Sequence, residues 1–206
     1  MTDNELLRSD GLKEGNSAPD FSFKSNNQRM NLADFRDRKV VLYFYPRDFT
    51  TGCTTEASEF TRDYEKFKSA GIEVIGVSPD SEESHEKFKQ KMNIPYHLAA
   101  DVDNSISKKY GTYGLKKFMG KEYMGVNRTT FLVDEKGKIV RIFIKVKPTG
   151  HSNEVLEAFG MTNKLISTGR KSHHLSCTWI SQDNPKSFLW YQEFWFQFFL
   201  FDTQLI

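Results

Sequence analysis

The stretch from Val40 to Phe60 constrains the fold of this chain more than any other part of the sequence. It opens with Val40–Tyr45, a run of β-branched and aromatic residues that ends at Pro46 and is typical of a strand buried on both faces. After Cys53 the apolar residues recur at steps of three and four, which predicts one buried face of a helix. Cys53 is therefore expected where a strand gives way to a helix, in or just before the first helical turn.

A cysteine in that position has special chemistry. Unpaired backbone N–H groups at the start of a helix favour an anion, and they lower the pKa of a thiol from about 8.5. A drop of two units, at about 1.4 kcal/mol each, would make the thiolate the main form at pH 7. Thr54, Thr55 and Glu56 follow as the oxygen acceptors and negative charge that suit a first turn. From position alone, Cys53 is either such a reactive thiol or a small buried apolar residue, as most free cysteines are.

The neighbours of Cys53 form a motif that favours the reactive thiol. Pro46, Thr50 and Cys53 have the spacing Pro-x-x-x-Thr-x-x-Cys, which resembles the peroxidatic motif of peroxiredoxins. The wider string YFYPRDFTTGCTTEASEF is similar to the bacterioferritin comigratory protein, or peroxiredoxin Q, subfamily. A second block, YGLKKFMGKEYMGVNRTTFLVDEKGKI from Tyr113 to Ile139, resembles a later region of the same subfamily. The resemblance covers the chain from about Leu12 to Phe159.

The resemblance implies a thioredoxin-like α/β sandwich, and the order of predicted elements fits it. The predicted central sheet is mixed and flanked by helices, since parallel crossovers are followed by one terminal hairpin. Cys53 would lie beyond the carboxyl ends of the strands, where such sheets gather reactive groups. The predicted elements after Val40–Tyr45 are a helix over Thr54–Ser69, a strand over Ile72–Ser78, a helix from Ser81 to Met92, a strand over Tyr96–Ala99, a helix over Asn104–Tyr110, strands over Thr129–Asp134 and Lys138–Val146, and a helix over Ser152–Phe159. A hairpin with a turn at Asn26 and Asn27 precedes them.

Composition and charge narrow the function classes. The formal net charge is +2 with 27% charged residues and no block of five Lys or Arg, so we expect no nucleic-acid partner. The two cysteines, Cys53 and Cys177, are too few for a disulfide-stapled secreted protein and favour a reducing compartment, the cytoplasm. The first residues lack the basic start and apolar segment of a signal peptide. No stretch approaches the ~20 apolar residues that span a bilayer.

The resemblance also implies an activity and a set of site residues. The chain would reduce hydrogen peroxide and small organic hydroperoxides with thiol-derived electrons, without a metal or organic cofactor. Cys53 would be the peroxidatic cysteine, whose thiolate attacks the peroxide and becomes sulfenic acid. Thr50 would supply a hydroxyl in the same loop, and Arg128 a guanidinium that donates to the thiolate and the peroxide. Pro46 would keep one side of the thiolate dry. Arg47 is a second candidate cation, expected to point to solvent.

Ser58 departs from the pattern of the subfamily. Many relatives carry a resolving cysteine at that place, five residues after the peroxidatic one, and others carry it in the second long helix. Here the first string is CTTEAS, and Ser81–Met92 contains no cysteine. Within the resembling region the chain is thus a one-cysteine enzyme, which we expect to be a monomer. Its sulfenic acid would be reduced by thioredoxin, glutaredoxin or glutathione, or else by Cys177.

The end of the sequence differs from the rest, and we expect two regions. Residues 1–160 would form the thioredoxin-like domain, and residues 161–206 an atypical aromatic-rich extension. In the extension Cys177 stands near His173 and His174, but a zinc site needs three or four protein ligands, so we expect no metal. The aromatic run Phe188–Phe201 could pack over the domain, bind a membrane interface or partner, or be a non-native extension. We favour an appended or aberrant tail.

Two other functions stay open. A thiol–disulfide oxidoreductase would need the motif Cys-x-x-Cys. Here the residue three positions after Cys53 is Glu56 and not a cysteine. Alternatively, the chain could be a peroxide sensor or interaction protein whose C-terminal tail docks a partner. Turnover separates the possibilities, because an enzyme cycles with excess reductant and a sensor stops after one equivalent of peroxide.

Overall fold

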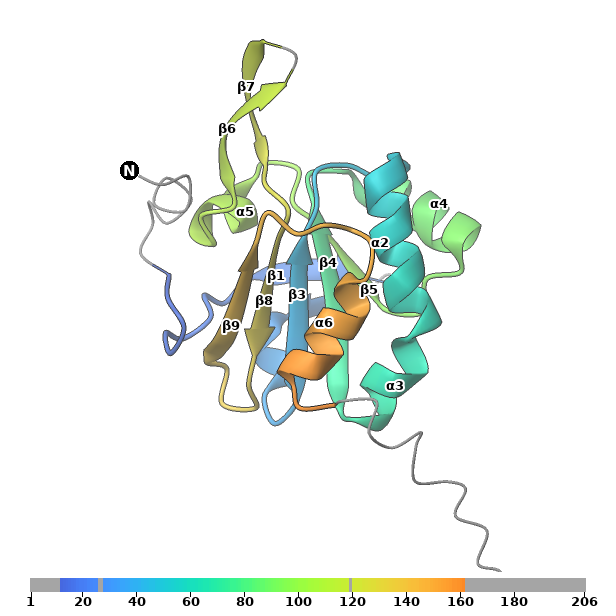
Figure 1. Ribbon diagram of the computed structural model, residues 1–206, viewed down its shortest axis with the longest axis vertical. Helices are drawn as coiled ribbons and strands as arrows, with labels where there is room; N and C mark the ends of the chain where they lie inside the picture. The colour runs from blue at the N-terminus through green and yellow to red at the C-terminus, as the bar shows by residue number, and fades with distance from the viewer. Residues whose placement is uncertain (1–11, 26–27, 119, 162–206) are drawn as a thin grey trace, which may run out of the picture. The chain divides into compact units, whose positions relative to one another are not determined.

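A mixed five-stranded sheet, in the order β5-β4-β3-β8-β9, forms the centre of the fold (Figure 1). The computed structural model describes residues 12–25, 28–118 and 120–161. Strand β3 (Lys39–Phe44) lies in the middle of the sheet, parallel to β4 (Ile72–Ser78), which is parallel to β5 (His97–Ala100). On its other side β3 pairs antiparallel with β8 (Thr129–Val133), and β8 pairs antiparallel with β9 (Ile139–Ile144).

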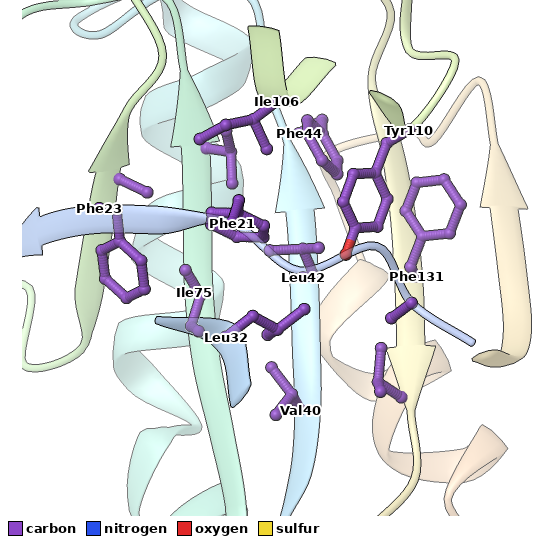
Figure 2. Close-up of a cluster of buried hydrophobic side chains, with 14 of the residues drawn as sticks. Phe21, Phe23, Leu32, Val40, Leu42, Phe44, Ile75, Ile106, Tyr110 and Phe131 are labelled. Atoms are coloured by element: carbon purple, nitrogen blue, oxygen red, sulfur yellow. The ribbon is translucent and has the colours of Figure 1, made fainter. Parts of the chain in front are cut away.

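Both faces of the sheet are covered, as the continuous apolar run in β3 predicts. Val40, Leu42 and Phe44 point to one face and pack with side chains of the N-terminal segment and of the short helix α5 (Figure 2). Val41 and Tyr43 point to the other face, which the remaining helices cover. The covering elements are β1 (Ser22–Ser25), β2 (Gln28–Asn31), η1 (Leu32–Phe35) and α5 (Ser105–Lys109) on the first face, and α2 (Thr51–Arg62), α3 (Tyr64–Ser69), α4 (Glu82–Met92) and α6 (His151–Ala158) on the second.

This arrangement is the thioredoxin-like sandwich that the sequence predicted. The strands of the central sheet and the helices after the first lie within two residues of their expected bounds, and β1 and β2 form the predicted N-terminal antiparallel hairpin. The turn residues Asn26 and Asn27 lie outside the described residues. The connection between β8 and β9 is the predicted hairpin, with Gly137 at a φ of 75°.

The single helix predicted over Thr54–Ser69 is wrong. Helix α2 begins three residues earlier than predicted, at Thr51, and ends at Arg62. Asp63 interrupts the helix, and α3 begins at Tyr64. Asp63 is buried, and its carboxylate accepts hydrogen bonds from Lys66 Nζ at 2.8 Å and Ser152 Oγ at 2.6 Å. Burial alone would raise the pKa of Asp63, but these bonds and one from the preceding arginine hold it well below its usual value. The break therefore turns a carboxylate inward, where it ties α2 to α6.

A second antiparallel hairpin, formed by β6 (Tyr113–Phe118) and β7 (Lys121–Val126), was not predicted. It extends beyond the edge of the sheet at which α2 begins (Figure 1). Its residues do not alternate regularly between polar and apolar types. The apolar residues that it does contain include Leu115 and Met124, which pair across the strands and are exposed. A hairpin without a buried face lacks the period that identifies strands in a sequence.

Gly76 in β4 allows an aromatic connection between the sheet and α2. A Cβ atom at this position would lie 2.7 Å from both Cζ and Oη of Tyr43, closer than side-chain atoms pack. The Tyr43 hydroxyl lies 3.1 Å from that of Tyr96, which donates to the Ala57 carbonyl of α2 at 3.2 Å. The missing side chain of Gly76 therefore gives the Tyr43 ring its place over the strand.

The predicted C-terminal extension lies outside the described residues except for Met161. The chain divides into two units, residues 1–165 and 166–206, and every described residue belongs to the first. The predicted division at residue 160 therefore stays a prediction. The same holds for the roles considered for Cys177, its neighbouring histidines and Phe188–Phe201. None of the helices in the described part of the chain is long and apolar enough to cross a membrane.

Candidate active site at the start of helix α2

Cys53 is the third residue of α2 and lies in its first turn, as predicted. The loop after β3 leads directly into this helix, so the cysteine lies beyond the carboxyl end of the central strand. Thr50 is the N-cap residue, and its carbonyl accepts the first helical hydrogen bond, from Thr54 N at 2.8 Å. Cys53 is only 2% exposed. The thiol therefore combines exclusion from bulk water with the positive end of a helix, and both affect the stability of its anion.

Arg128 lies against Cys53, with Nη2 3.1 Å from Sγ. It immediately precedes β8, and the register pairs Thr129 with Phe44 at the carboxyl end of β3. The two residues are far apart in sequence, but antiparallel pairing of β3 and β8 brings them to the same edge of the sheet. The structure thus joins the predicted cysteine and arginine through a charge-assisted contact.

Gly52 makes room for this contact. A Cβ atom at Gly52 would lie 3.3 and 3.4 Å from the two terminal nitrogens of Arg128, and 3.4 Å from Cγ of Pro148. The 3.3 Å separation is slightly tighter than ordinary packing and the other two are at its limit, so a side chain here would press on the guanidinium. The glycine within the predicted motif lets Arg128 lie flat against the start of α2.

Glu56 is a part of the site that the sequence analysis did not single out. It was noted only as negative charge that suits a first helical turn, and its side chain is fully buried beneath Arg128. Arg128 Nε lies 3.3 Å from Glu56 Oε2, yet the N–H does not point at the oxygen, and neither atom makes a hydrogen bond. Burial raises the pKa of Glu56 to about 8, although Arg128 acts to lower it. At neutral pH the carboxyl is mostly protonated and leaves the charge of Arg128 available to Cys53.

Glu56→Gln is expected to remove a pH-dependent loss of stability. Between pH 4.5, the ordinary pKa, and about 8 the folded protein holds a proton that the unfolded chain releases. The free energy of unfolding therefore decreases as pH rises through this window, by a few kcal/mol at most. Urea unfolding at pH 5 and pH 8 should show a weaker decrease in the Gln variant than in the parent.

The exposed Glu65→Gln in α3 is the matched control and should keep the pH dependence of the parent. Equal pH dependence in the parent and in Glu56→Gln would contradict the buried, protonated state of Glu56.

Asp48 anchors the loop that carries the motif. It is 4% exposed, and it accepts hydrogen bonds from Tyr45 Oη and Ser84 Oγ, both at 2.7 Å, with His85 Nδ1 at 2.9 Å. Burial would raise the pKa of Asp48, but the bonds from His85, Ser84 and Tyr45 outweigh it and keep the pKa below its usual value. The ionised carboxylate thus ties the loop to α4, an arrangement that no sequence pattern indicated.

Of the other predicted residues, Pro46, Arg47 and Thr50 lie in the loop before α2, and Ser58 lies in α2 itself. The hydroxyl of Thr50 is exposed and donates to the Arg47 carbonyl at 3.1 Å. Pro46 is half-buried, and Arg47 is exposed, as expected for a cation that points to solvent. Ser58 donates to the Thr54 carbonyl at 2.8 Å, one turn back along α2. The catalytic roles of Thr50 and Pro46 stay predictions.

Comparison with known proteins gives consistent matches. The model of the AhpC/TSA family matches residues 15–142. Peroxiredoxin Bcp from Bacillus subtilis is 43% identical over 147 residues, which are 71% of this chain and 94% of that protein. Peroxiredoxin Q from Xanthomonas campestris, a solved structure, is 33% identical with a TM-score of 0.65, over 68% of this chain and 90% of the other. A yeast mitochondrial 1-Cys peroxiredoxin is 27% identical with a TM-score of 0.63, over 72% and 75% of the two chains.

Proposed function

The chain belongs to the AhpC/TSA family, and on this basis we propose that Cys53 is its peroxidatic cysteine and Arg128 the cation that activates it. The protein is a thiol peroxidase, an oxidoreductase that reduces hydroperoxides with electrons from thiols. The observation that carries the residue assignment is the 3.1 Å contact between Arg128 Nη2 and Cys53 Sγ. A guanidinium stays charged at any working pH, so it favours the thiolate over the thiol.

In the proposed reaction the thiolate of Cys53 attacks the outer oxygen of a hydroperoxide. A sulfur–oxygen bond forms as the oxygen–oxygen bond breaks, and the sulfur keeps the attacked oxygen with its hydrogen as sulfenic acid. The other oxygen leaves as hydroxide or alkoxide and takes a proton from solvent. Arg128 donates to the oxygens as charge passes onto them. We assign the Thr50 hydroxyl to binding the peroxide, and Pro46 to excluding water from the thiolate.

Reduction of the sulfenic acid is proposed to require an outside thiol. Cys53 is the one cysteine among the described residues, and Ser58 occupies the place where a resolving thiol would stand in the same helix. For the similar yeast 1-Cys peroxiredoxin, resolution proceeds via glutathione and thioredoxin systems. A thioredoxin-like protein, glutaredoxin or glutathione would therefore supply two thiols, which become a disulfide while Cys53 returns to its thiol and the sulfenic oxygen leaves as water. The small number of cysteines supports the cytoplasm as its compartment, and a monomeric state stays a prediction.

One equivalent of peroxide is expected to give sulfenic acid at Cys53 and no disulfide within the first 160 residues. Excess peroxide without reductant should then give sulfinic acid, since no thiol in that part of the chain can intercept the intermediate. Mass spectrometry of the full chain, with a reagent that traps sulfenic acid, checks both products. Cys177→Ser is the control and should give the same products. A dominant bridge between Cys53 and Cys177 would instead assign resolution to the tail.

Turnover distinguishes the enzyme from a sensor. Peroxide consumption should continue with excess reductant, and parallel assays with thioredoxin, glutaredoxin and glutathione should identify the reductant by its rate. Consumption that stops after one equivalent with all three would favour the peroxide sensor.

A further inference from the structure

Lys116 is a second cation near the candidate site, and it comes from the β6–β7 hairpin. Its side chain is half-buried, and Nζ donates to the Val126 carbonyl at 3.0 Å. Val126 is buried at the end of β7 and lies two residues before Arg128. The next residue, Asn127, donates its N–H to the Thr112 carbonyl at 2.7 Å. The base of the hairpin thus holds, from two sides, the backbone that presents Arg128.

The hairpin contains a path for the Lys116 side chain. Lys116 pairs with Tyr123 across the two strands, and Gly125 is two residues further along β7. A Cβ atom at Gly125 would lie 3.3 Å from Cδ of Lys116. The glycine therefore lets the lysine stem lie along the strand toward Val126, with the ammonium directed to the base of the hairpin.

The charge of Lys116 interacts with both Arg128 and Cys53. Burial lowers the pKa of Lys116 and the Arg128 guanidinium lowers it further, whereas Cys53 raises it. Two positive charges close together in a half-buried site repel each other, and a nearby anion offsets the cost of that repulsion. Figure 1 shows the hairpin and the start of α2 beyond the same edge of the sheet.

The buried carboxylate nearest to Arg128 supplies little of that negative charge. Burial keeps Glu56 mostly protonated at neutral pH. Glu59 accepts a hydrogen bond from the Gly150 N–H at 2.8 Å. His151, which also feels the charges of Glu59 and Arg128, is buried, and burial lowers its pKa and favours the neutral ring. Cys53 Sγ, 3.1 Å from Arg128 Nη2 and electrostatically coupled to Lys116, is a counter-ion for the two cations when it is ionised.

We propose that Lys116 is a positioning residue of the peroxidase: its ammonium group fixes the backbone that presents Arg128 and adds a second positive charge that stabilises the Cys53 thiolate. The proposal rests on the proposed function, because it assigns a role to Lys116 only through the reaction of Cys53.

Lys116→Met is expected to move the thiolate titration of Cys53 to higher pH. The test uses the full chain with Cys177→Ser, so that Cys53 is the one thiol to react with iodoacetamide, and follows the rate of alkylation from pH 4 to 10. Loss of one nearby charge should shift the midpoint by about one unit and so lower the thiolate fraction roughly tenfold below it. The rate of peroxide reduction should fall by a similar factor at low pH and recover at high pH. Lys116→Arg should stay near the parent.

Lys117→Met, which removes the exposed lysine next in sequence, is the matched control and should leave the titration unchanged. Lys116→Gln removes the charge but keeps a donor, so it tests the charge even if the Met variant fails to fold. Equal midpoints in the parent, Lys116→Gln and Lys117→Met would overturn the proposal. A rate lowered equally at every pH, with an unshifted midpoint, would overturn the charge role of Lys116 and leave only its contact with the Val126 carbonyl.

The same data separate this proposal from the proposed function. A parent thiol that alkylates normally but does not react with peroxide would overturn the function of Cys53, and the role of Lys116 with it. A parent that reduces peroxide, together with an unshifted Lys116→Met titration, would overturn only the role of Lys116.

Discussion

Cys53→Ser should abolish peroxide turnover and leave the fold intact. A serine hydroxyl does not ionise near neutral pH, so the variant lacks the anion that attacks the peroxide. Removal of a catalytic nucleophile typically costs at least about 10⁴-fold in rate. The side chain is nearly the same size, and an oxygen in place of the buried sulfur should cost about 1 kcal/mol of stability. Peroxide consumption with dithiothreitol, and urea unfolding of the same sample, measure the two effects.

Cys177→Ser is the matched control, because it removes the other thiol of the chain. It should keep most of the activity. If Cys177→Ser lost turnover while Cys53→Ser retained it, the candidate site would be wrong.

Arg128→Leu should slow peroxide reduction by about 10²- to 10³-fold, the usual effect of removing a donor that stabilises developing charge. It should also move the thiolate titration of Cys53 to higher pH. Leucine fills much of the same space but cannot replace the contact of Nη2 with Sγ. Lysine should restore only part of the rate, because an ammonium is a point charge that cannot reproduce the forked geometry of the guanidinium, whose Nη2 contacts Sγ.

The exposed Arg47→Leu in the neighbouring loop controls for loss of an arginine near the site. It should keep the rate and the titration of the parent. An Arg128→Leu variant whose thiolate titration is unchanged would contradict the proposed role, whatever its rate.

The sequence predicted the parts of the site that follow from the main chain. The apolar run before Pro46 identifies a central strand, and the change of period after it identifies a helix, so Cys53 had to lie between them. Arg128 was expected near it through the family resemblance, and the antiparallel pairing of β3 and β8 accounts for the contact. Local patterns suffice where one strand and one helix decide the position of a residue.

The parts that the sequence did not predict depend on several distant elements at once. In the sequence Glu56 is only an acid that suits a first helical turn, and its burial beneath Arg128 appears only in the fold. Asp48 becomes the anchor of the loop only because α4 brings Ser84 and His85 to it. The position of Lys116 depends on a hairpin whose strands lack a buried face. Such burial arises from tertiary packing, and no spacing of residues along the chain records it.

The aromatic connection through Gly76 has a consequence for how such chains vary in evolution. The Cβ of any larger residue at this position would occupy the space of the Tyr43 ring, whose hydroxyl contacts that of Tyr96, which in turn donates to the Ala57 carbonyl in α2. A mutation at Gly76 is therefore tolerable only after, or together with, a smaller side chain in place of Tyr43. Positions 43, 76 and 96 should therefore co-vary among related sequences, and glycine should be kept at position 76 wherever both tyrosines are kept.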